Sequence, residues 1–321
     1  AAGAPRPVPT GEMGLRVEPA ADGTSVTVAE VLAGSPAARA DAGLRVGDRI
    51  LAVNGRRLAA GDNFFALLAD TVRQRTVLRV AGADGERDVE LRPAPFAQRR
   101  QDRYHAWVKE RRALVERWSG GKLGYIHIQG MDAPSLEEFE RDLFAAAHGK
   151  QGLLIDVRNN GGGWTTDYLM AMLSVRRHAW TVPRGADPAV KAYPDAERLL
   201  LSAWTRPALT LCDQDSYSNA EIFSWAFKTT GRGSVVGMPT FGAVISTGGA
   251  RLTDGSFVRL PGRGWYVAGS GINQENNGCV PDVIVAQPPE QDFAADADAQ
   301  LARAVEVLLG QLPASPDALP W

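Results

Sequence analysis

Three short polar segments hold the residues of this sequence that could do chemistry. They are a glycine-rich segment at 156–163, a serine at Ser218, and a polar loop that contains Glu275. A glycine-rich turn can present backbone N–H groups to an anion, a serine can act as a nucleophile, and a carboxylate can orient a histidine. Together these residue types point to acyl transfer, and each segment taken alone also has a simpler explanation.

The glycine-rich segment reads DVRNNGGG and follows the apolar run 152–157. A turn that leaves a buried strand and enters a helix points its N–H groups at an anion. This segment lacks the Lys-Ser/Thr pair of a nucleotide loop and the spacing of a dinucleotide fingerprint. An oxyanion hole is the other common use of such a turn.

Ser218 lies between a predicted strand and a predicted helix, in the text DSYSNAEIF. At a helix N-terminus the helix dipole would favour the serine alkoxide. The structural explanation is that Ser218 is an N-cap and that Glu221 completes a capping box. Glu275 lies in GINQENNGCVPDV, just before a predicted strand, where a carboxylate could orient a histidine or remain solvated.

The composition argues against several other function classes. The 321 residues carry 35 basic and 37 acidic side chains, a balance that gives no electrostatic attraction to nucleic acid or anionic lipid. No apolar stretch approaches the roughly 18 residues that a membrane helix needs. Two cysteines and four histidines are too few for a disulfide scaffold or a Cys/His metal cluster. We expect no nucleic-acid or membrane partner, no metal and no cofactor.

The elements that position these segments alternate between helix and strand over residues 97–312. The apolar patterns predict strands at 123–128, 152–157 and 208–212, and helices at 97–118, 135–147, from Ser218 onward and at 298–309. In the first helix, expected to break near its middle, Tyr104, Trp107, Val108 and Leu114 form one stripe. The alternation predicts an α/β domain with a largely parallel sheet. Residues 174–206 lack clear periodicity and are expected to form a long loop.

The N-terminal part predicts a small β-rich module. Strands are expected at 15–17, 26–28 and 49–53, with a hairpin of 77–80 and 89–91. Ser35 and Pro36 predict a capped short helix that ends at Gly43. Asn54-Gly55 predicts a hairpin turn, and the apolar spacing over 63–72 predicts a second helix.

This order, with the text GSPAARADAGLRVGDRILAVNG at 34–55, resembles a PDZ domain. The resemblance implies that a peptide adds as a strand, with its carboxylate at the backbone N–H groups near Met13, Gly14 and Leu15. The alternative is a closed groove in a module that only gates or scaffolds.

The order and spacing of NGGGW, SNAEIF, a glycine-rich hairpin region and ENNGCVPDV resemble the tail-specific protease superfamily, serine peptidase family S41. The resemblance implies a PDZ-like β-barrel or sandwich module followed by an α/β serine protease domain of the ClpP/crotonase type. Its C-terminal processing members pair the serine with a lysine 25 residues later, where this chain has Ala243.

The tricorn protease branch also lacks that lysine, and its text is similar to RYHAWVKERR, GYIHI, DVRNNGGG, SNAEIF and VVGMPTFGAVIS here. The resemblance implies that Ser218 is the nucleophile and that Glu275 orients the catalytic imidazole. It assigns the oxyanion hole to the N–H groups of Gly163 and Asn219. The substrate site is assigned to Gly161, Gly162, Thr181 and Gly242, where Thr181 replaces an acidic residue that binds basic P1 side chains.

The catalytic histidine of tricorn proteases precedes the PDZ module. The four histidines here are His105, His127, His148 and His178, and none is expected to be the base. We therefore expect a C-terminal portion of a longer protein that is nearly inactive alone. The alternatives are a peptide-binding scaffold with a vestigial protease site and a Ser-Lys processing protease that uses Lys228 or Lys191.

The expected organisation is a linker at 1–12, without the features of a secretory signal. A PDZ-like domain at 13–95, a protease domain at 96–312 and a tail at 313–321 would follow it. The resemblance implies peptide substrates, a homo-oligomer of six copies and a cytoplasmic location. A periplasmic location is the alternative, if a signal precedes Ala1.

Overall fold

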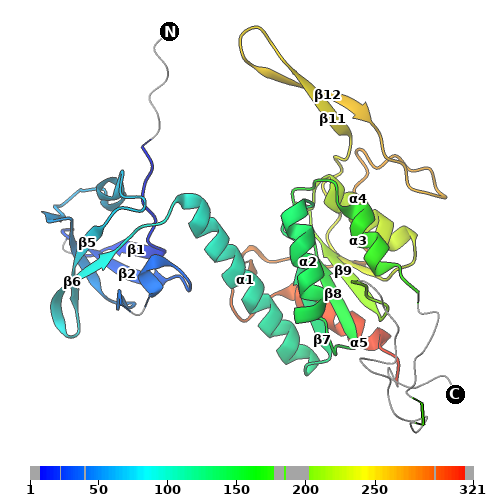
Figure 1. The fold of residues 1–321 in the computed structure, drawn as a ribbon, viewed down its shortest axis with the longest axis horizontal. Coiled ribbons are helices and arrows are strands. Elements are labelled where there is room, and N and C mark those ends of the chain that lie inside the picture. Colours follow the sequence, from blue (N-terminus) through cyan, green and yellow to red (C-terminus); the bar gives the residue numbers. More distant parts are fainter. Residues whose placement is uncertain are drawn as a thin grey trace. The chain divides into compact units, whose positions relative to one another are not determined.

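A computed structural model describes residues 8–21, 23–39, 41–176, 184–185, 202–292 and 294–314. The chain folds as two compact units that divide between Lys109 and Glu110 (Figure 1). Among the described residues, no helix combines the length and apolar character that crossing a bilayer requires.

The N-terminal unit is built on one antiparallel sheet. Its strands are β1 (Leu15–Pro19), β2 (Val26–Val31), β3 (Arg49–Val53), β5 (Thr76–Gly82) and β6 (Gly85–Leu91), in that spatial order, and the short β4 (Arg56–Arg57) also pairs with β3. Alternate strand residues such as Val28, Ile50 and Leu78 are buried in one core. The predicted strands and the hairpin are confirmed.

The two helices predicted in this unit are shorter than expected. The second is a 3-10 helix over Phe64–Leu68, because Asp70 and Arg73 adopt left-handed backbone conformations, with φ of 57° and 59°, that no right-handed helix continues through. The first is a 3-10 helix over Pro36–Ala38, and the expected hydroxyl cap is wrong, because the Ser35 side chain makes no capping hydrogen bond.

Helix α1 (Phe96–Ser119) runs without interruption for 24 residues across the boundary between the units. The expected break near its middle is wrong. The segment contains neither proline nor glycine, the residues that most often kink a helix.

The C-terminal unit has a five-stranded parallel sheet at its centre. Its spatial order is β13 (Val283–Ile284), β10 (Val235–Gly237), β9 (Ala208–Cys212), β8 (Gly152–Asp156) and β7 (Leu123–His127). Residues of β7, β8 and β9 are buried on both faces, as expected where helices cover both sides of a parallel sheet. The predicted α/β class is confirmed.

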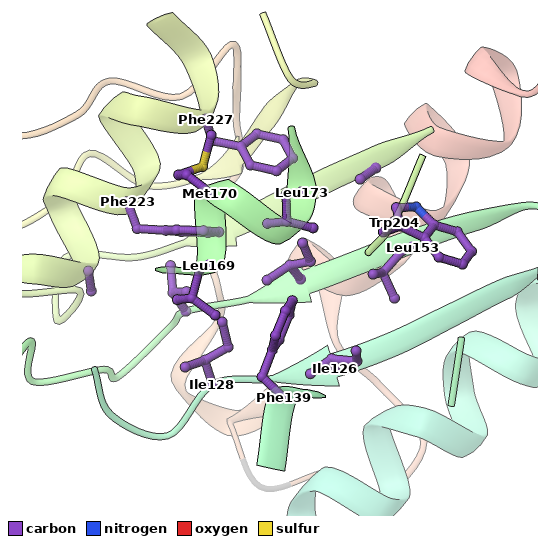
Figure 2. Close-up of a cluster of buried hydrophobic side chains, with 14 of the residues drawn as sticks. Ile126, Ile128, Phe139, Leu153, Leu169, Met170, Leu173, Trp204, Phe223 and Phe227 are labelled. Carbon is purple, nitrogen blue, oxygen red and sulfur yellow. The ribbon is translucent and has the colours of Figure 1, made fainter. Parts of the chain in front are cut away.

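Helices on the two faces of this sheet bury alternate strand residues. On one face, α2 (Ala133–Ala145), α3 (Thr166–Leu173) and α4 (Asn219–Thr229) contribute Phe139, Leu169 and Phe223 to a core that includes Ile126 and Leu153 (Figure 2). Helix α5 (Ala299–Gln311) packs against β8, β9 and β10. The sheet is therefore a rigid platform for the loops at its carboxyl edge.

One hairpin stands out from the body of the C-terminal unit (Figure 1). Strands β11 (Ser246–Arg251) and β12 (Phe257–Arg263) pair only with each other, and all of their residues are exposed. The glycine-rich hairpin expected between the serine and Glu275 is thus present.

Candidate active site

Two of the three polar segments follow neighbouring parallel strands. The glycine-rich turn follows β8, and the turn that ends at Ser218 follows β9. Carboxyl ends of parallel strands meet at one edge of a sheet, so these two turns lie together. A Cβ atom placed on Gly162 would lie 2.6 Å from Ser218 Cβ and 2.9 Å from Asn219 N, which shows how closely they pack.

Ser218 adopts a strained backbone conformation at the start of α4. Its φ is 55° and its ψ is −115°, a region that costs an L residue on the order of 1–3 kcal/mol. Its N–H donates to the Glu221 carboxylate at 3.0 Å, as the expected capping box requires. Such strain is held where the surroundings fix it, and it is common at catalytic sites.

The glycine-rich turn requires glycine at Gly163. With φ of 147°, this residue would place a Cβ atom 1.9 Å from the Met131 carbonyl oxygen. The Gly162 N–H donates to the Asn160 side chain at 2.9 Å, and the Trp164 N–H donates to Met131 O at 2.7 Å. The turn is thereby fixed on both sides of Gly163.

The N–H groups of Gly163 and Asn219 stand out because their neighbours are all engaged. Ser218 N–H donates to Glu221, and Ala220 N–H donates to Tyr217 O at 3.1 Å. Within the part of the chain that the structure describes, neither Gly163 nor Asn219 donates its N–H to any acceptor. Two uncommitted donors on adjacent turns beside a serine are what an oxyanion hole requires.

The Asn219 side chain has a structural task. Its Oδ1 accepts from Thr166 N at 3.0 Å and from Thr166 Oγ1 at 3.0 Å, which ties α4 to the first residue of α3. An aspartate would accept the same two bonds. The side chain can therefore differ between relatives while the backbone N–H stays in place.

Glu275 is half-buried and firmly held. One carboxylate oxygen, Oε2, accepts from Val244 N at 2.8 Å and from Ile245 N at 2.9 Å. Its other oxygen accepts no hydrogen bond from the described residues. Nearby, Gly242 O accepts from Asn276 N at 2.8 Å, so the predicted Gly242 lies beside the loop of Glu275.

No described histidine is hydrogen-bonded to Ser218 or Glu275. His127 is buried in β7, where Nε2 donates to Arg158 O at 3.0 Å, and burial lowers its pKa. His148 is exposed and His105 lies in the N-terminal unit, while His178 falls outside the described residues. Among the described histidines, none occupies the position of a base.

Of the two lysines considered as an alternative base, the structure describes only Lys228. Lys228 lies in the last turn of α4, and its Nζ is 2.8 Å from Asp282 Oδ1 and donates to Val280 O at 2.9 Å. Nine residues of helix separate it from Asn219, a rise of about 14 Å. Lys191 and the predicted Thr181 lie outside the described residues.

Sequence reasoning missed a buried ionic network beneath the glycine-rich turn. Arg158 Nη2 donates to Asp156 Oδ2 at 2.7 Å and its Nη1 donates to Asp298 Oδ1 at 3.0 Å, while Tyr125 OH donates to Asp156 at 2.9 Å. Burial alone would raise the pKa of Asp156, but the charge of Arg158 holds it below its ordinary value. The sequence Asp156-Val157-Arg158, which contains the acidic and the basic member of this network, was the signal that could have revealed it.

Exposed aromatic side chains flank the two turns. The Phe241 ring, 62% exposed, lies 5.1 Å from that of Tyr217, which precedes Ser218. Trp164, which follows Gly163, is 55% exposed and contacts Tyr168 edge-on. Among the described residues, no group of three His, Cys, Asp or Glu side chains is placed to hold a metal ion.

The three residues predicted to bind a peptide carboxylate lie at one edge of the N-terminal sheet, where β1 pairs only with β2. Met13 and Leu15 are buried in the core, and the carbonyls of Met13 and Gly14 accept from Ala37 N and Leu32 N. An edge strand can receive an added strand, so both alternatives for this module stay predictions.

Comparison with known proteins identifies both units. Residues 122–285, just over half of the chain, match peptidase family S41, and residues 27–82 match the PDZ domain family. Tricorn protease homolog 1 of Streptomyces coelicolor is 37% identical over 288 residues, which are 89% of this chain and 26% of that protein.

One further relative and one solved structure also carry the tricorn protease name. A protein of Sulfurisphaera tokodaii named as a tricorn-like protease C-terminal subunit is 30% identical over 315 residues, 95% of this chain and 35% of its own. A crystal structure of the tricorn protease aligns with a TM-score of 0.78 at 27% identity, over 94% of this chain and 29% of that one.

The chain thus spans about a quarter to a third of the length of these relatives. The match to the family model covers β7 through β13, and so includes both turns at the sheet edge and the Glu275 loop. The chain therefore belongs to peptidase family S41, and its N-terminal unit carries a PDZ domain.

Proposed function

We propose that this chain is the catalytic portion of a tricorn-type serine peptidase in which Ser218 attacks the peptide bond. One observation carries the proposal. A serine with a strained backbone packs against the turn of Gly163 and directly precedes Asn219, and the backbone N–H groups of these two residues have no acceptor among the described residues. Removing one such donor typically costs 10²- to 10³-fold in turnover, so this arrangement bears directly on catalysis.

The chemistry follows the rules of acyl transfer. A histidine takes the proton of Ser218 Oγ as that oxygen bonds to the substrate carbonyl carbon, and the carbonyl oxygen becomes an oxyanion bound by the two N–H groups. The imidazolium then gives its proton to the leaving amine as the C–N bond breaks. Water, deprotonated by the same histidine, hydrolyses the acyl-enzyme.

In this scheme Glu275 orients the imidazole. Its free carboxylate oxygen is available to accept from the imidazole N–H, while Val244 and Ile245 hold the other oxygen. We place the histidine outside this chain's described residues. The chain matches only 35% of a relative named a tricorn-like protease C-terminal subunit, so most of that protein lies outside the matched part and has room for the base.

Two other functions compete with this one. The Ser-Lys scheme is disfavoured, because Ala243 occupies the lysine position and Lys228 is paired with Asp282. A peptide-binding scaffold with a vestigial site is favoured by one observation, the lack of a described histidine at Ser218.

Further parts of the proposal rest on the resemblance to tricorn proteases. We propose that the substrates are unfolded peptides, that Gly161, Gly162, Gly242 and Thr181 contribute to the substrate site, and that the protein assembles as a hexamer in the cytoplasm. Sedimentation of the purified protein tests the assembly, and fractionation of cells tests the location.

A fluorophosphonate probe tests the mechanism, because it labels only a serine whose hydroxyl is activated. We expect no labelling of residues 1–321 alone and labelling of the longest natural chain that contains them, lost in Ser218→Ala. Labelling in neither form would favour the scaffold. Fast labelling of residues 1–321 alone would show that the base lies within this chain.

A further inference from the structure

Glu221 is a fully buried carboxylate one helical turn after Ser218. Its Oε1 accepts from Ser218 N at 3.0 Å and from Ala243 N at 2.9 Å. Its Oε2 accepts from Thr240 Oγ1 at 2.7 Å and from Gly242 N. A capping box explains only the first of these four bonds.

The loop of residues 240–245, which binds Glu221, also binds Glu275. Four consecutive N–H groups, those of residues 242–245, donate to only two carboxylates, the first two to Glu221 and the next two to Glu275. Short backbone steps therefore connect the turn of the nucleophile to the residue that would orient the imidazole. A shift of Glu221 would move both.

The physical chemistry makes this connection stiff. A buried carboxylate is tolerated when hydrogen bonds replace the lost water, and bonds to a charged acceptor are the stronger kind. In the described chain Glu221 forms no ion pair, so those four donors provide its stabilisation. Gly242, with φ of 86°, lets the loop turn closely around the carboxylate.

We propose that Glu221 is a positioning residue that couples the placement of Ser218 to the placement of Glu275. The inference rests on the proposed function for the roles of those two residues. Glu221 itself touches neither substrate nor the reacting atoms. It holds the loop 240–245 at a fixed distance from the first turn of α4, so that the nucleophile and the imidazole partner move together.

The variant Glu221→Gln tests the coupling. The new side chain has the shape of glutamate, but an NH2 group replaces one acceptor oxygen. This NH2 group would then face one of two pairs of donors in place of an acceptor. One pair is the N–H groups of Ser218 and Ala243, and the other is the Thr240 hydroxyl and the Gly242 N–H. The variant Thr240→Val removes one donor to Glu221 and leaves the carboxylate intact, and it also removes the acceptor of Cys279 N, which donates to Thr240 Oγ1 at 2.8 Å.

The experiment is amide hydrogen exchange, followed by NMR, on residues 1–321 with Glu221→Gln, Glu275→Ala or Thr240→Val. In Glu221→Gln we expect exchange about 10- to 100-fold faster at Val244 and Ile245, which Glu221 does not contact. Coupling is reciprocal, so Glu275→Ala, which removes the acceptor of Val244 N and Ile245 N, should speed exchange at Ser218. Exchange in β7 and β8 should stay unchanged.

Two results would overturn the coupling. One is faster exchange only at the amides that the replaced side chain binds, and the other is an equal rise throughout β7 and β8. If Glu221→Gln does not fold, Glu275→Ala and Thr240→Val decide, since neither alters Glu221. Thr240→Val should speed exchange at Ser218 by a smaller factor in the same direction.

A second arm uses the rate of fluorophosphonate labelling in the longest natural chain. The Glu221→Gln and Glu275→Gln double variant should be slowed by less than the product of the two single factors, because the two residues act as one unit. Absence of labelling in the unmutated protein would refute the proposed function, and the exchange rates alone would then decide whether the two sites are coupled.

Discussion

At the scale of single residues, the site depends on a few backbone atoms. The N–H groups of Gly163 and Asn219 lack acceptors among the described residues, while the N–H groups of the residues immediately before and after each of them are hydrogen-bonded. The side chains around them, those of Asn160, Asn219 and Glu221, serve to hold the backbone. Substitutions that shift this backbone should therefore impair catalysis without removing any reacting group.

Gly163→Ala tests this at one atom. Its Cβ would lie 1.9 Å from the Met131 carbonyl oxygen, so the turn must shift and carry the Gly163 N–H with it. We expect fluorophosphonate labelling of the longest natural chain to slow by about 10²- to 10³-fold. Gly248→Ala is the control, because a Cβ there meets no atom within 4 Å. Equal rates in both variants would contradict the role of Gly163.

At the scale of elements, the parallel sheet brings distant segments together. Strands β8 and β9 end side by side, which places the turn of Gly163 against that of Ser218. On the α5 side, Asp298 both caps that helix, accepting from Leu301 N at 2.9 Å, and pairs with Arg158. The network therefore fixes α5 to the strand end that begins the glycine-rich turn.

Substitution of Asp298 separates these two tasks. Asp298→Asn keeps a capping side chain and loses the ion pairs with Arg158 and Arg111, whereas Asp298→Ala loses the cap as well. We expect Asp298→Ala to lower the free energy of unfolding by about 3 kcal/mol or more, since two buried arginines each lose a partner. The Asn variant should lose about 1 kcal/mol less, the usual value of a cap. Urea unfolding measures both, and equal losses would show that the cap contributes nothing.

At the scale of the whole molecule, the proposed function assigns to this chain only part of a catalytic apparatus. The chain spans about a quarter of its Streptomyces relative, and no described histidine is hydrogen-bonded to Ser218 to supply the base that the proposed mechanism needs. The buried His127, at the end of β7, is instead part of the fold. Its effect should appear in stability and not in catalysis.

The pH dependence of unfolding tests that assignment. Burial lowers the pKa of His127, so the unfolded chain takes up a proton at a pH where the folded chain does not. The stability from the neutral form is complete above the ordinary pKa of about 6.5 and is lost as the pH falls below it. His127→Gln should flatten the dependence below about pH 6.5, whereas His148→Gln, at an exposed site, should not. Parallel curves for all three proteins would contradict the prediction.

Local patterns in the sequence were enough to predict the order of most elements and the position of the motifs, but the short strand β10 was not among the predicted strands. Apolar periodicity marks β7, β8 and β9, and the glycine and serine motifs fall at the ends of two of these strands. Such patterns are readable because burial on a strand or helix repeats locally. Two predictions from these patterns were wrong: the helix expected at 63–72 ends at Leu68, and α1 has no break.

Which donors are free, and which side chains hold the site, becomes visible only in the folded chain. That Glu221 binds the loop 240–245, or that Gly163 closes against Met131, depends on residues 19 to 32 positions apart in the chain. Hydrogen-bond satisfaction is a property of every group that surrounds an atom. No local window of sequence contains those surroundings, and so the chemistry of this site could be located from the sequence but its geometry could not.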